Sequence, residues 1–466
     1  MAIAFGETFA KVRECFQEPT IDAQVTQKLH SITIIRDVYG KIRIFLEPQE
    51  GMEIEDADLT ELKNRLSQNL GPYYGEDIWL PQGEKDGYKA LIDVIHQEKI
   101  AAEWDKETRS PRWYILERHI AKLAWTNKES GNPPWSEDNV DDGHKPAVVT
   151  FFSFKGGVGR TTALVATALT LARHGHRVAM VDLDLEAPGL STILLPDTDN
   201  LTGAIDYLLE KPIYNSHKIK ITWPFQPHIK QINDQTLLGD AGETLRLLPA
   251  GTVDNDYLEK LARLDFQNLA DNQLPETFRG MLRELESATR PLDFILLDAR
   301  AGFHDIGGLA IADLSHAAVI FGRQSSQSWA GLTHVIRRLS LSKSEEQRLP
   351  LLLVHAMAPQ LTTPGSSIEL AKFRETAYDI FKENYYSKGE TVPNQNDTDA
   401  PFTPLVLSWH DNLQGDIALF PRDNSQEEAI RLLAIVDAMT SQPYQNLADR
   451  LCRLFERNLK KSDQEG

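Results

Sequence analysis

The pattern of apolar and polar residues divides the chain into two parts. Near the N-terminus, residues 31–47 contain apolar positions that alternate with charged ones at a period of two, which predicts two strands joined by a turn at Tyr39-Gly40. Residues 56–70 place leucines on one face of a helix that ends before Gly71-Pro72. A second helix is expected over about residues 111–125. Residues 1–125 therefore predict a small α+β domain without a catalytic constellation.

After residue 147 the strands become apolar throughout, and several are separated by enough chain for a crossover helix. Runs that are apolar on both faces are typical of parallel strands covered by helices on both sides. The expected strands are AVVTFFSF, RVAMVDLD, LRLLPAG, LDFILLDA, AAVIFG and LPLLLVHAMA. Residues 147–466 therefore predict an α/β domain with a doubly wound, mostly parallel sheet. The polar stretch 126–146, rich in Pro, Gly, Asn, Asp and Glu, is expected to be a linker.

Composition narrows the classes of protein that fit. The chain has 466 residues, and its 68 acidic against 49 basic side chains give a net charge of −19, which argues against a surface that is basic throughout. The two cysteines, Cys15 and Cys452, cannot form a zinc or cluster site of the usual kind. No apolar run approaches the ~18–20 residues of a membrane span, and no signal peptide is recognisable. A cytoplasmic protein is expected.

The segment FFSFKGGVGRTT, residues 151–162, carries the clearest chemistry. A buried strand is followed by three glycines that let the backbone turn tightly, and a helix begins at the threonine pair. Backbone N–H groups and the positive end of the helix then point at one place, which is suited to phosphate. The hydroxyl residue that opens the helix, Thr161, is placed to bind Mg²⁺.

KGGVGRTT resembles the deviant Walker A motif of the ParA/MinD-type P-loop ATPases. The resemblance extends over about 300 residues, because VDLD, LRLLPAG and LDFILLDARAG follow in the family's order. It implies a magnesium-dependent ATPase that forms a homodimer around ATP. The early lysine, Lys155, would reach the nucleotide of the partner protomer. We expect the nucleotide-binding residues to be Gly156, Gly157, Val158, Gly159, Arg160, Thr161, Thr162, Arg300 and Gly302.

The carboxylates at two strand ends complete the expected site. The resemblance places Asp298 in the Walker B position, where it would hold Mg²⁺ through a water, and Asp184 in switch I, beside the attacking water. The candidate metal residues are Thr161, Asp182 and Asp298. The candidate catalytic residues are Lys155, Asp184 and Arg160.

Two positions depart from the family's pattern. Arg160 stands where a lysine is usual, and DARAG replaces the more common DxPPG, which puts Arg300 near the γ-phosphate. Because arginine keeps its charge and can bind two phosphate oxygens at once, we expect Arg160 to contact the β- and γ-phosphates. Nucleotide binding should survive these changes, while the rate of hydrolysis stays open.

Several alternatives remain at this point. The first hypothesis is a nucleotide-switched ATPase whose N-terminal domain senses or delivers a signal to an unknown protein partner, in regulation or in phage defence; the second is a non-hydrolysing ATP-binding scaffold. A biosynthetic ligase would need a substrate pocket that the sequence does not reveal. Arg337, Arg338 and Lys343 could bind nucleic acid, but a solvated helix face is the simpler interpretation. The amphipathic tail, residues 446–461, fits a packed closing helix better than a membrane-surface helix.

Overall fold

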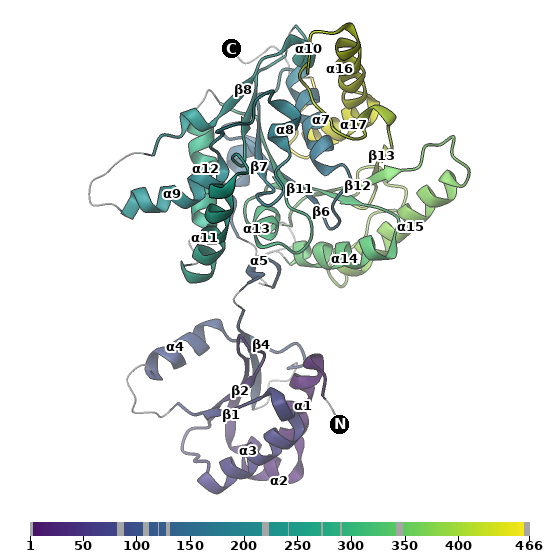
Figure 1. The fold of residues 1–466 in the computed structure, drawn as a ribbon. Coiled ribbons are helices and arrows are strands. Elements are labelled where there is room, and N and C mark those ends of the chain that lie inside the picture. The colour runs from purple at the N-terminus through teal and green to yellow at the C-terminus, as the bar shows by residue number, and fades with distance from the viewer. Residues whose placement is uncertain are drawn as a thin grey trace. The chain divides into compact units, whose positions relative to one another are not determined.

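The computed structural model describes residues 3–460 except for 82–87, 106–110, 120, 127–130, 217–222, 241, 272–273, 289–290 and 342–347. The chain forms two compact units, Met1–Ala121 and Lys122–Gly466 (Figure 1). Each has its own sheet and its own buried apolar core. A small α+β domain therefore precedes the larger α/β domain, as the sequence predicts.

The first unit contains a five-stranded sheet in the order β3-β2-β1-β5-β4. Its strands are β1 (Leu29–Arg36), β2 (Ile42–Pro48), β3 (Tyr74–Trp79), β4 (Ile100–Ala101) and β5 (Arg112–Glu117). Its helices are α1 (Thr8–Gln17), α2 (Pro19–Gln24), α3 (Asp56–Leu70) and α4 (Tyr88–Glu98). The expected hairpin and the leucine-faced helix are present as β1, β2 and α3, and Leu62, Leu66 and Leu70 are fully buried.

The helix expected over about residues 111–125 is wrong for most of its length. Residues 112–117 form β5, which pairs in parallel with β1, and only α5 (Leu123–Thr126) is helical. The run RWYILE is aromatic and β-branched, which favours a strand once a neighbouring strand is available to pair with it. Trp113 packs its ring edge-on against Phe16, with ring centroids 5.6 Å apart, so it belongs to the core of this unit.

The second unit is built on an eight-stranded sheet in the order β13-β12-β11-β6-β10-β7-β9-β8, in which only β8 runs antiparallel to its neighbour. Its strands are β6 (Ala147–Ser153), β7 (Val178–Leu183), β8 (Lys230–Ile232), β9 (Leu245–Leu248), β10 (Phe294–Ala299), β11 (Ala317–Gly322), β12 (Leu351–Ala358) and β13 (Leu405–Ser408). The doubly wound, mostly parallel sheet is confirmed.

Helices cover both faces of this sheet (Figure 1). One core holds Val149 and Phe151 of β6 together with α7 (Arg160–Arg173), α16 (Gln426–Met439) and α17 (Gln442–Arg453). The other core holds Val148 and Phe152 of the same strand, because successive side chains point to opposite faces. Its helices are α9 (Ala204–Ser216), α11 (Asn255–Asp271), α12 (Leu274–Ser287), α13 (Asp305–Asp313), α14 (Ser326–Ser340) and α15 (Ser366–Asn384). The shortest helices are α6 (Glu137–Asp141), α8 (Leu190–Leu194) and α10 (Gln235–Leu238).

The tail helix α17 closes the second unit. Leu447 and Leu451 are fully buried, and α17 packs on α7. The interpretation of the tail as a packed closing helix is confirmed. None of the helices in the described residues is both long and apolar enough to cross a membrane.

The stretch expected as a linker, residues 126–146, is in good part packed on the second unit. Trp135 stacks on His316 and donates from Nε1 to the carbonyl of Pro146 at 2.9 Å, and Val140 is fully buried. A few apolar residues therefore anchor a segment whose composition is otherwise polar. The boundary between the units falls between residues 121 and 122, ahead of this stretch.

Candidate phosphate and metal site

The loop between β6 and α7 has the backbone conformation expected of a phosphate-binding loop. Gly157 and Gly159 have φ of 68° and 77°, in the left-handed region that favours glycine. A Cβ added at either position would meet nothing within 4 Å, so the backbone conformation, and not a lack of space, requires glycine. Val158 is buried, Lys155 is half-buried, and Gly156 and Gly157 are exposed. The helix begins at Arg160, beside the exposed loop.

Arg160 links the carboxylates at the ends of two strands. Its Nε donates to Oδ1 of Asp298 at 2.5 Å, and its Nη2 donates to Oδ2 of Asp184 at 2.8 Å. Only 8% of Arg160 is exposed. Burial lowers the pKa of the Arg160 guanidinium, but the two carboxylates outweigh it and raise the pKa above its ordinary value. Arg160 therefore carries its charge here as the counter-ion of Asp184 and Asp298.

Asp298 also binds the first turn of the helix. The Thr161 hydroxyl donates to Oδ2 of Asp298 at 2.7 Å, and Asp298 is fully buried. Burial raises the pKa of Asp298, against the opposing effects of Arg160 and Thr161. The structure thus brings together Arg160, Thr161 and Asp298, which the sequence placed in the binding and metal groups.

Asp182 lies beside Asp298 and holds the following loop. The two residues are register partners on adjacent parallel strands. Asp182 accepts N–H bonds from Gly189 and Leu190 at 3.0 Å and from Asp184 at 3.2 Å. Burial and the nearby Asp298 raise the pKa of Asp182 to about 8. In this arrangement Asp182 fixes residues 184–190 through their backbone, and its role as a metal residue stays a prediction.

Two further side chains join this loop to the segment after β10. Glu186 forms an ion pair with Arg300, whose Nη1 lies 2.6 Å from Oε2, and pairs with His304 Nε2 at 2.5 Å. Arg300 Nη1 also lies 3.8 Å from Oδ1 of Asp184. The Gly302 N–H donates to the Ser153 carbonyl at 3.1 Å, which fastens the same segment to the end of β6. Glu186 and His304 were not predicted as site residues, although each lies within a few residues of a predicted motif.

A shallow hollow of about 50 Å³ adjoins the phosphate loop. It is lined on one side by Val158, Gly159 and Thr162, and on the other by Met357 of β12 and by residues in and after β13, including Trp409 and His410. Trp409 is 44% exposed and offers an aromatic face at its edge. Sequence reasoning did not identify these residues, since they lie about 250 positions after the loop that they border.

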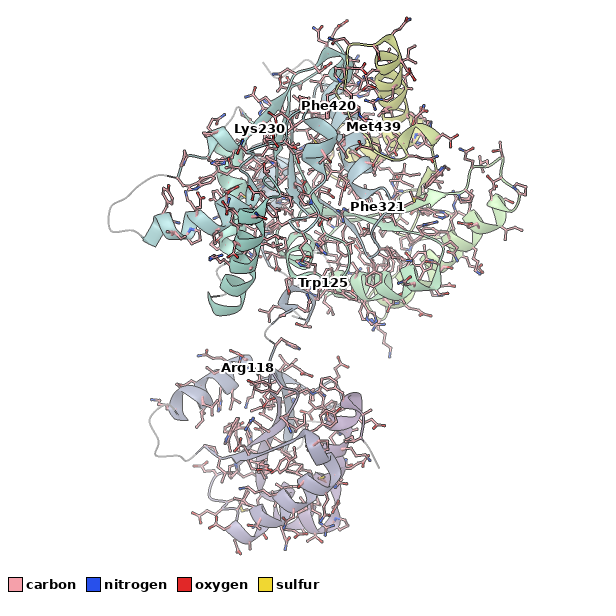
Figure 2. All side chains as sticks on the ribbon, viewed as in Figure 1. Arg118, Trp125, Lys230, Phe321, Phe420 and Met439 are labelled. Carbon is pink, nitrogen blue, oxygen red and sulfur yellow. The ribbon has the colours of Figure 1, made fainter. Side chains whose placement is uncertain are left out.

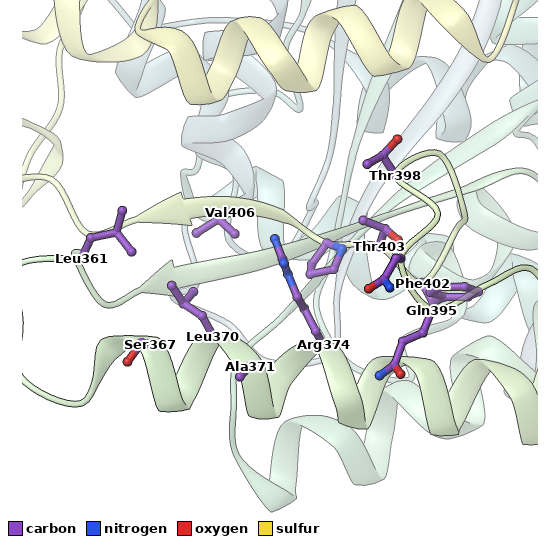
Figure 3. Close-up of a pocket in the computed structure, with 12 residues that line it drawn as sticks. Leu361, Ser367, Leu370, Ala371, Arg374, Gln395, Thr398, Phe402, Thr403 and Val406 are labelled. Atoms are coloured by element: carbon purple, nitrogen blue, oxygen red, sulfur yellow. The ribbon is translucent and has the colours of Figure 1, made fainter.

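A larger cavity of about 640 Å³ lies at the edge of the sheet, between α15 and β13. Figure 3 shows Arg374 extending from α15 toward β13, with Leu361, Leu370 and Val406 in the same cavity. Its other polar side chains come from the exposed loop at residues 395–398 and from Ser367 and Thr403. Strand order separates β13 from β6 by two strands, and no residue of the phosphate loop lines the cavity, so it is distinct from the phosphate site.

Comparisons with known proteins match the part of the chain that contains the loop between β6 and α7. Residues 149–291 match the family model described as the CobQ/CobB/MinD/ParA nucleotide binding domain. A putative septum site-determining protein MinD from Chlorella vulgaris is 28% identical over 190 residues, which are 40% of this chain and 55% of the relative. A cytosolic Fe-S cluster assembly factor, CFD1 from Candida albicans, is 26% identical over 102 residues, 22% of this chain and 35% of the relative. The chain thus spans about half or less of each relative's length.

Solved structures that are similar to this chain include a MinD protein and a cobyrinic acid a,c-diamide synthase, both at low sequence identity. MinD complexed with Mg-ADP from Pyrococcus horikoshii is 18% identical, with 67% of this chain and 98% of that chain covered and a TM-score of 0.40. Cobyrinic acid a,c-diamide synthase from Mycobacterium smegmatis, with bound ATP analog and magnesium, is 19% identical, with 63% and 93% covered and a TM-score of 0.36. Together with the loop between β6 and α7, the family match identifies residues 149–291, within the second unit, as a nucleotide-binding domain of the CobQ/CobB/MinD/ParA type.

Proposed function

We propose that the protein is a cytoplasmic ATPase that binds Mg²⁺ and ATP and switches between two states. The observation that carries the proposal is the meeting of Arg160 and Thr161, at the start of α7, with Asp184 and Asp298, at the ends of β7 and β10. Ligands of open α/β sheets bind at the carboxyl ends of the strands, and these side chains gather at that edge. The N-terminal unit would sense or deliver the signal, in regulation or phage defence, with an unidentified protein partner.

The donor groups fit Mg²⁺ and phosphate. A hydroxyl and carboxylates are the ligands that Mg²⁺ prefers, and Mg²⁺ usually takes only one or two carboxylates together with phosphate oxygens. Consistent with this, the described residues contain no group of three or more His, Cys, Asp or Glu that could hold a metal ion by themselves. Thr161 and Asp298 would hold the ion, with Asp182 beside them. Bound there, Mg²⁺ would neutralise charge that develops on the phosphates.

Different groups of the chain would then bind the phosphates and orient the attacking water. Backbone N–H groups of residues 156–162 would bind phosphate oxygens at the positive end of α7. Arg160 would exchange a carboxylate for the β- and γ-phosphates, and Arg300 and Gly302 would border the γ-phosphate. Asp184 would then be free to orient the attacking water and accept its proton. Turnover of the purified full chain, measured as phosphate release with Mg²⁺ and ATP, tests this function.

The second candidate is a scaffold that binds ATP without hydrolysing it. The arrangement of Asp184 favours it, because one oxygen of this carboxylate accepts from Arg160 and the other lies 3.8 Å from Arg300. In this arrangement Asp184 serves as a counter-ion to two guanidinium groups. Phosphate release that stays at background, alone and with candidate partners, while calorimetry shows ATP binding, would select the scaffold.

Lys155 tests the homodimer. We expect Lys155→Ala to bind ATP nearly as well as the parent, because Arg160 and the loop N–H groups remain, but to lose the ATP-dependent dimer. Light scattering with and without Mg·ATP measures the dimer, and calorimetry measures binding. Lys145→Ala, which removes a lysine that pairs with Glu286 at 2.8 Å, is the matched control. An unchanged ATP-bound dimer in Lys155→Ala would contradict the dimer proposal.

Trp409 tests where the base lies. We expect Trp409→Ala to weaken ATP binding by about tenfold, because stacking of a base on an aromatic ring contributes about 1–3 kcal/mol. Inorganic triphosphate, which lacks the base, should bind both proteins equally in calorimetry. Trp409→Phe keeps an aromatic face and should bind ATP almost like the parent. Equal ATP affinity for Trp409→Ala and the parent would place the base elsewhere.

A further inference from the structure

The first residues of the second unit are fastened to the segment that follows the Asp298 strand. The Trp125 indole donates from Nε1 to the carbonyl of His304 at 2.8 Å. Lys122 pairs with Asp305 through Nζ at 3.1 Å, and its backbone N–H donates to the same carboxylate. These contacts join Lys122–Thr126 to the start of α13, and Figure 2 labels Trp125 on the second unit.

Aromatic rings continue this contact to the phosphate loop. The ring centroid of Trp125 lies 5.3 Å from that of Phe303 and 5.4 Å from that of Phe152. Phe303 in turn lies 5.1 Å from Phe154, the residue directly before Lys155. Trp125 therefore contacts the residue next to His304 and, through one further ring, the beginning of the loop.

Gly308 in α13 leaves the space that the Trp125 ring fills. A Cβ on Gly308 would lie 2.6 Å from Nε1 and 2.8 Å from Cε2 of Trp125, closer than real contacts allow. On the other side, Arg338 of α14 donates to the Ala124 carbonyl at 2.7 Å. With this bond and an exposed fraction of 4%, Arg338 is part of this packing, so the expected solvated face, and with it a basic surface for nucleic acid, is wrong at this position. Lys343 lies outside the described residues.

We propose that Lys122–Thr126 transmits a movement of residues 300–304, caused by the bound nucleotide, to the segment that leads to the N-terminal unit. This inference rests on the proposed function, because it needs a ligand that acts on Arg300 and Gly302. A ligand that displaces Arg300 from Glu186 also moves Phe303 and the His304 carbonyl, which are two of Trp125's contacts. Trp125 then has to follow this movement or lose its hydrogen bond and ring packing. Because Lys122 begins the second unit, either response changes the anchoring of the segment that connects to residues 1–121.

Hydrogen exchange of the full chain, with and without Mg·ATP, tests the proposal. We expect the exchange rates of both 300–304 and 122–126 to change when Mg·ATP is added, by about tenfold or more in 122–126. If 300–304 responds and 122–126 does not, the inference is overturned and the proposed function stands. If calorimetry finds no binding of Mg·ATP, both are overturned.

The variant Gly308→Ala tests whether the response of residues 122–126 can be lost while the protein still folds and binds ATP. Alanine is a better helix former than glycine and removes no group, yet its Cβ excludes the Trp125 ring. We expect 122–126 to exchange at least about tenfold faster and to become insensitive to Mg·ATP, while ATP affinity stays within about threefold of the parent. Trp125→Ala should behave in the same way from the other side of the contact. Trp135→Ala, which removes a ring packed on His316, should keep the parent's response. A normal Mg·ATP response of 122–126 in Gly308→Ala and Trp125→Ala would overturn the inference.

Discussion

Arg160→Ala is expected to destabilise the second unit by about 3–5 kcal/mol and to weaken ATP binding severely. The substitution removes the counter-ion of two buried carboxylates at once, and an uncompensated buried charge carries a penalty of this order. Without the guanidinium, the pKa of Asp298 should rise further above its ordinary value. When folding raises the pKa of a carboxyl group, the free energy of unfolding of the protein decreases as the pH increases. The destabilisation by Arg160→Ala should therefore be larger at pH 8 than at pH 5.5. Scanning calorimetry at both pH values, and titration calorimetry with ATP, measure the two effects.

Two variants make the Arg160 result specific. Arg160→Lys restores a point charge and should retain moderate ATP binding, although a lysine cannot make both planar contacts. Arg177→Ala breaks another arginine–aspartate pair, in which Arg177 Nη2 lies 2.8 Å from Oδ1 of Asp293. Arg177 directly precedes β7, so this pair lies outside the candidate site. Arg177→Ala should lower the stability of the second unit less than Arg160→Ala does, and it should leave ATP affinity unchanged. ATP affinity equal to the parent's in Arg160→Ala would show that this loop does not bind the phosphates.

Asp184→Ala is expected to bind Mg·ATP normally and to hydrolyse it about 10²–10⁴-fold more slowly than the parent, the usual range for a positioned acid–base group. Asp184 is 9% exposed, and one of its oxygens has no hydrogen-bond partner, so it can receive a proton from a water. The ATP-bound dimer should accumulate, because hydrolysis would be what reopens it. Phosphate release and light scattering over time measure both results.

The neighbouring carboxylate provides the control for Asp184. Glu186→Gln leaves Asp184 intact and removes the charge that holds Arg300 and His304, so it should slow hydrolysis less than Asp184→Ala does. Unimpaired hydrolysis in Asp184→Ala would exclude Asp184 from the mechanism. A parent without turnover under any condition would favour the scaffold.

Six strands of the second unit, β6, β7, β9, β10, β11 and β12, and the phosphate loop could be predicted because local sequence determines them, whereas the short strands β8 and β13 were not predicted. A strand buried on both faces has to be apolar throughout, and the glycines at 157 and 159 adopt a conformation that other residues rarely take. The β5 strand could not be predicted in this way, since its register depends on β1, some 80 residues earlier in the chain. Contacts across the fold were also out of reach, as the packing of Trp125 against Gly308 and Phe303 shows.

Within the site, residues that belong to one local motif could be predicted, and side-chain pairs between motifs could not. The motifs indicated that Arg160, Thr161 and Asp298 act together, and the structure brings them within hydrogen-bonding distance. They did not indicate that Arg160 would pair with Asp184 as well, because pairing depends on how far each side chain reaches into the buried edge of the sheet. Their contacts with nucleotide and metal remain predictions.

The paired state of Arg160 also sets an expectation for the kinetics of nucleotide binding. Phosphate that arrives at the loop competes with Asp184 and Asp298 for a guanidinium that is already buried and charged. Association therefore requires a first encounter at the exposed glycines and then an exchange of ion-pair partners inside the protein. The observed rate constant of ATP association should consequently reach a plateau at high ATP concentration. The plateau value should be the rate constant with which Arg160 leaves its carboxylates.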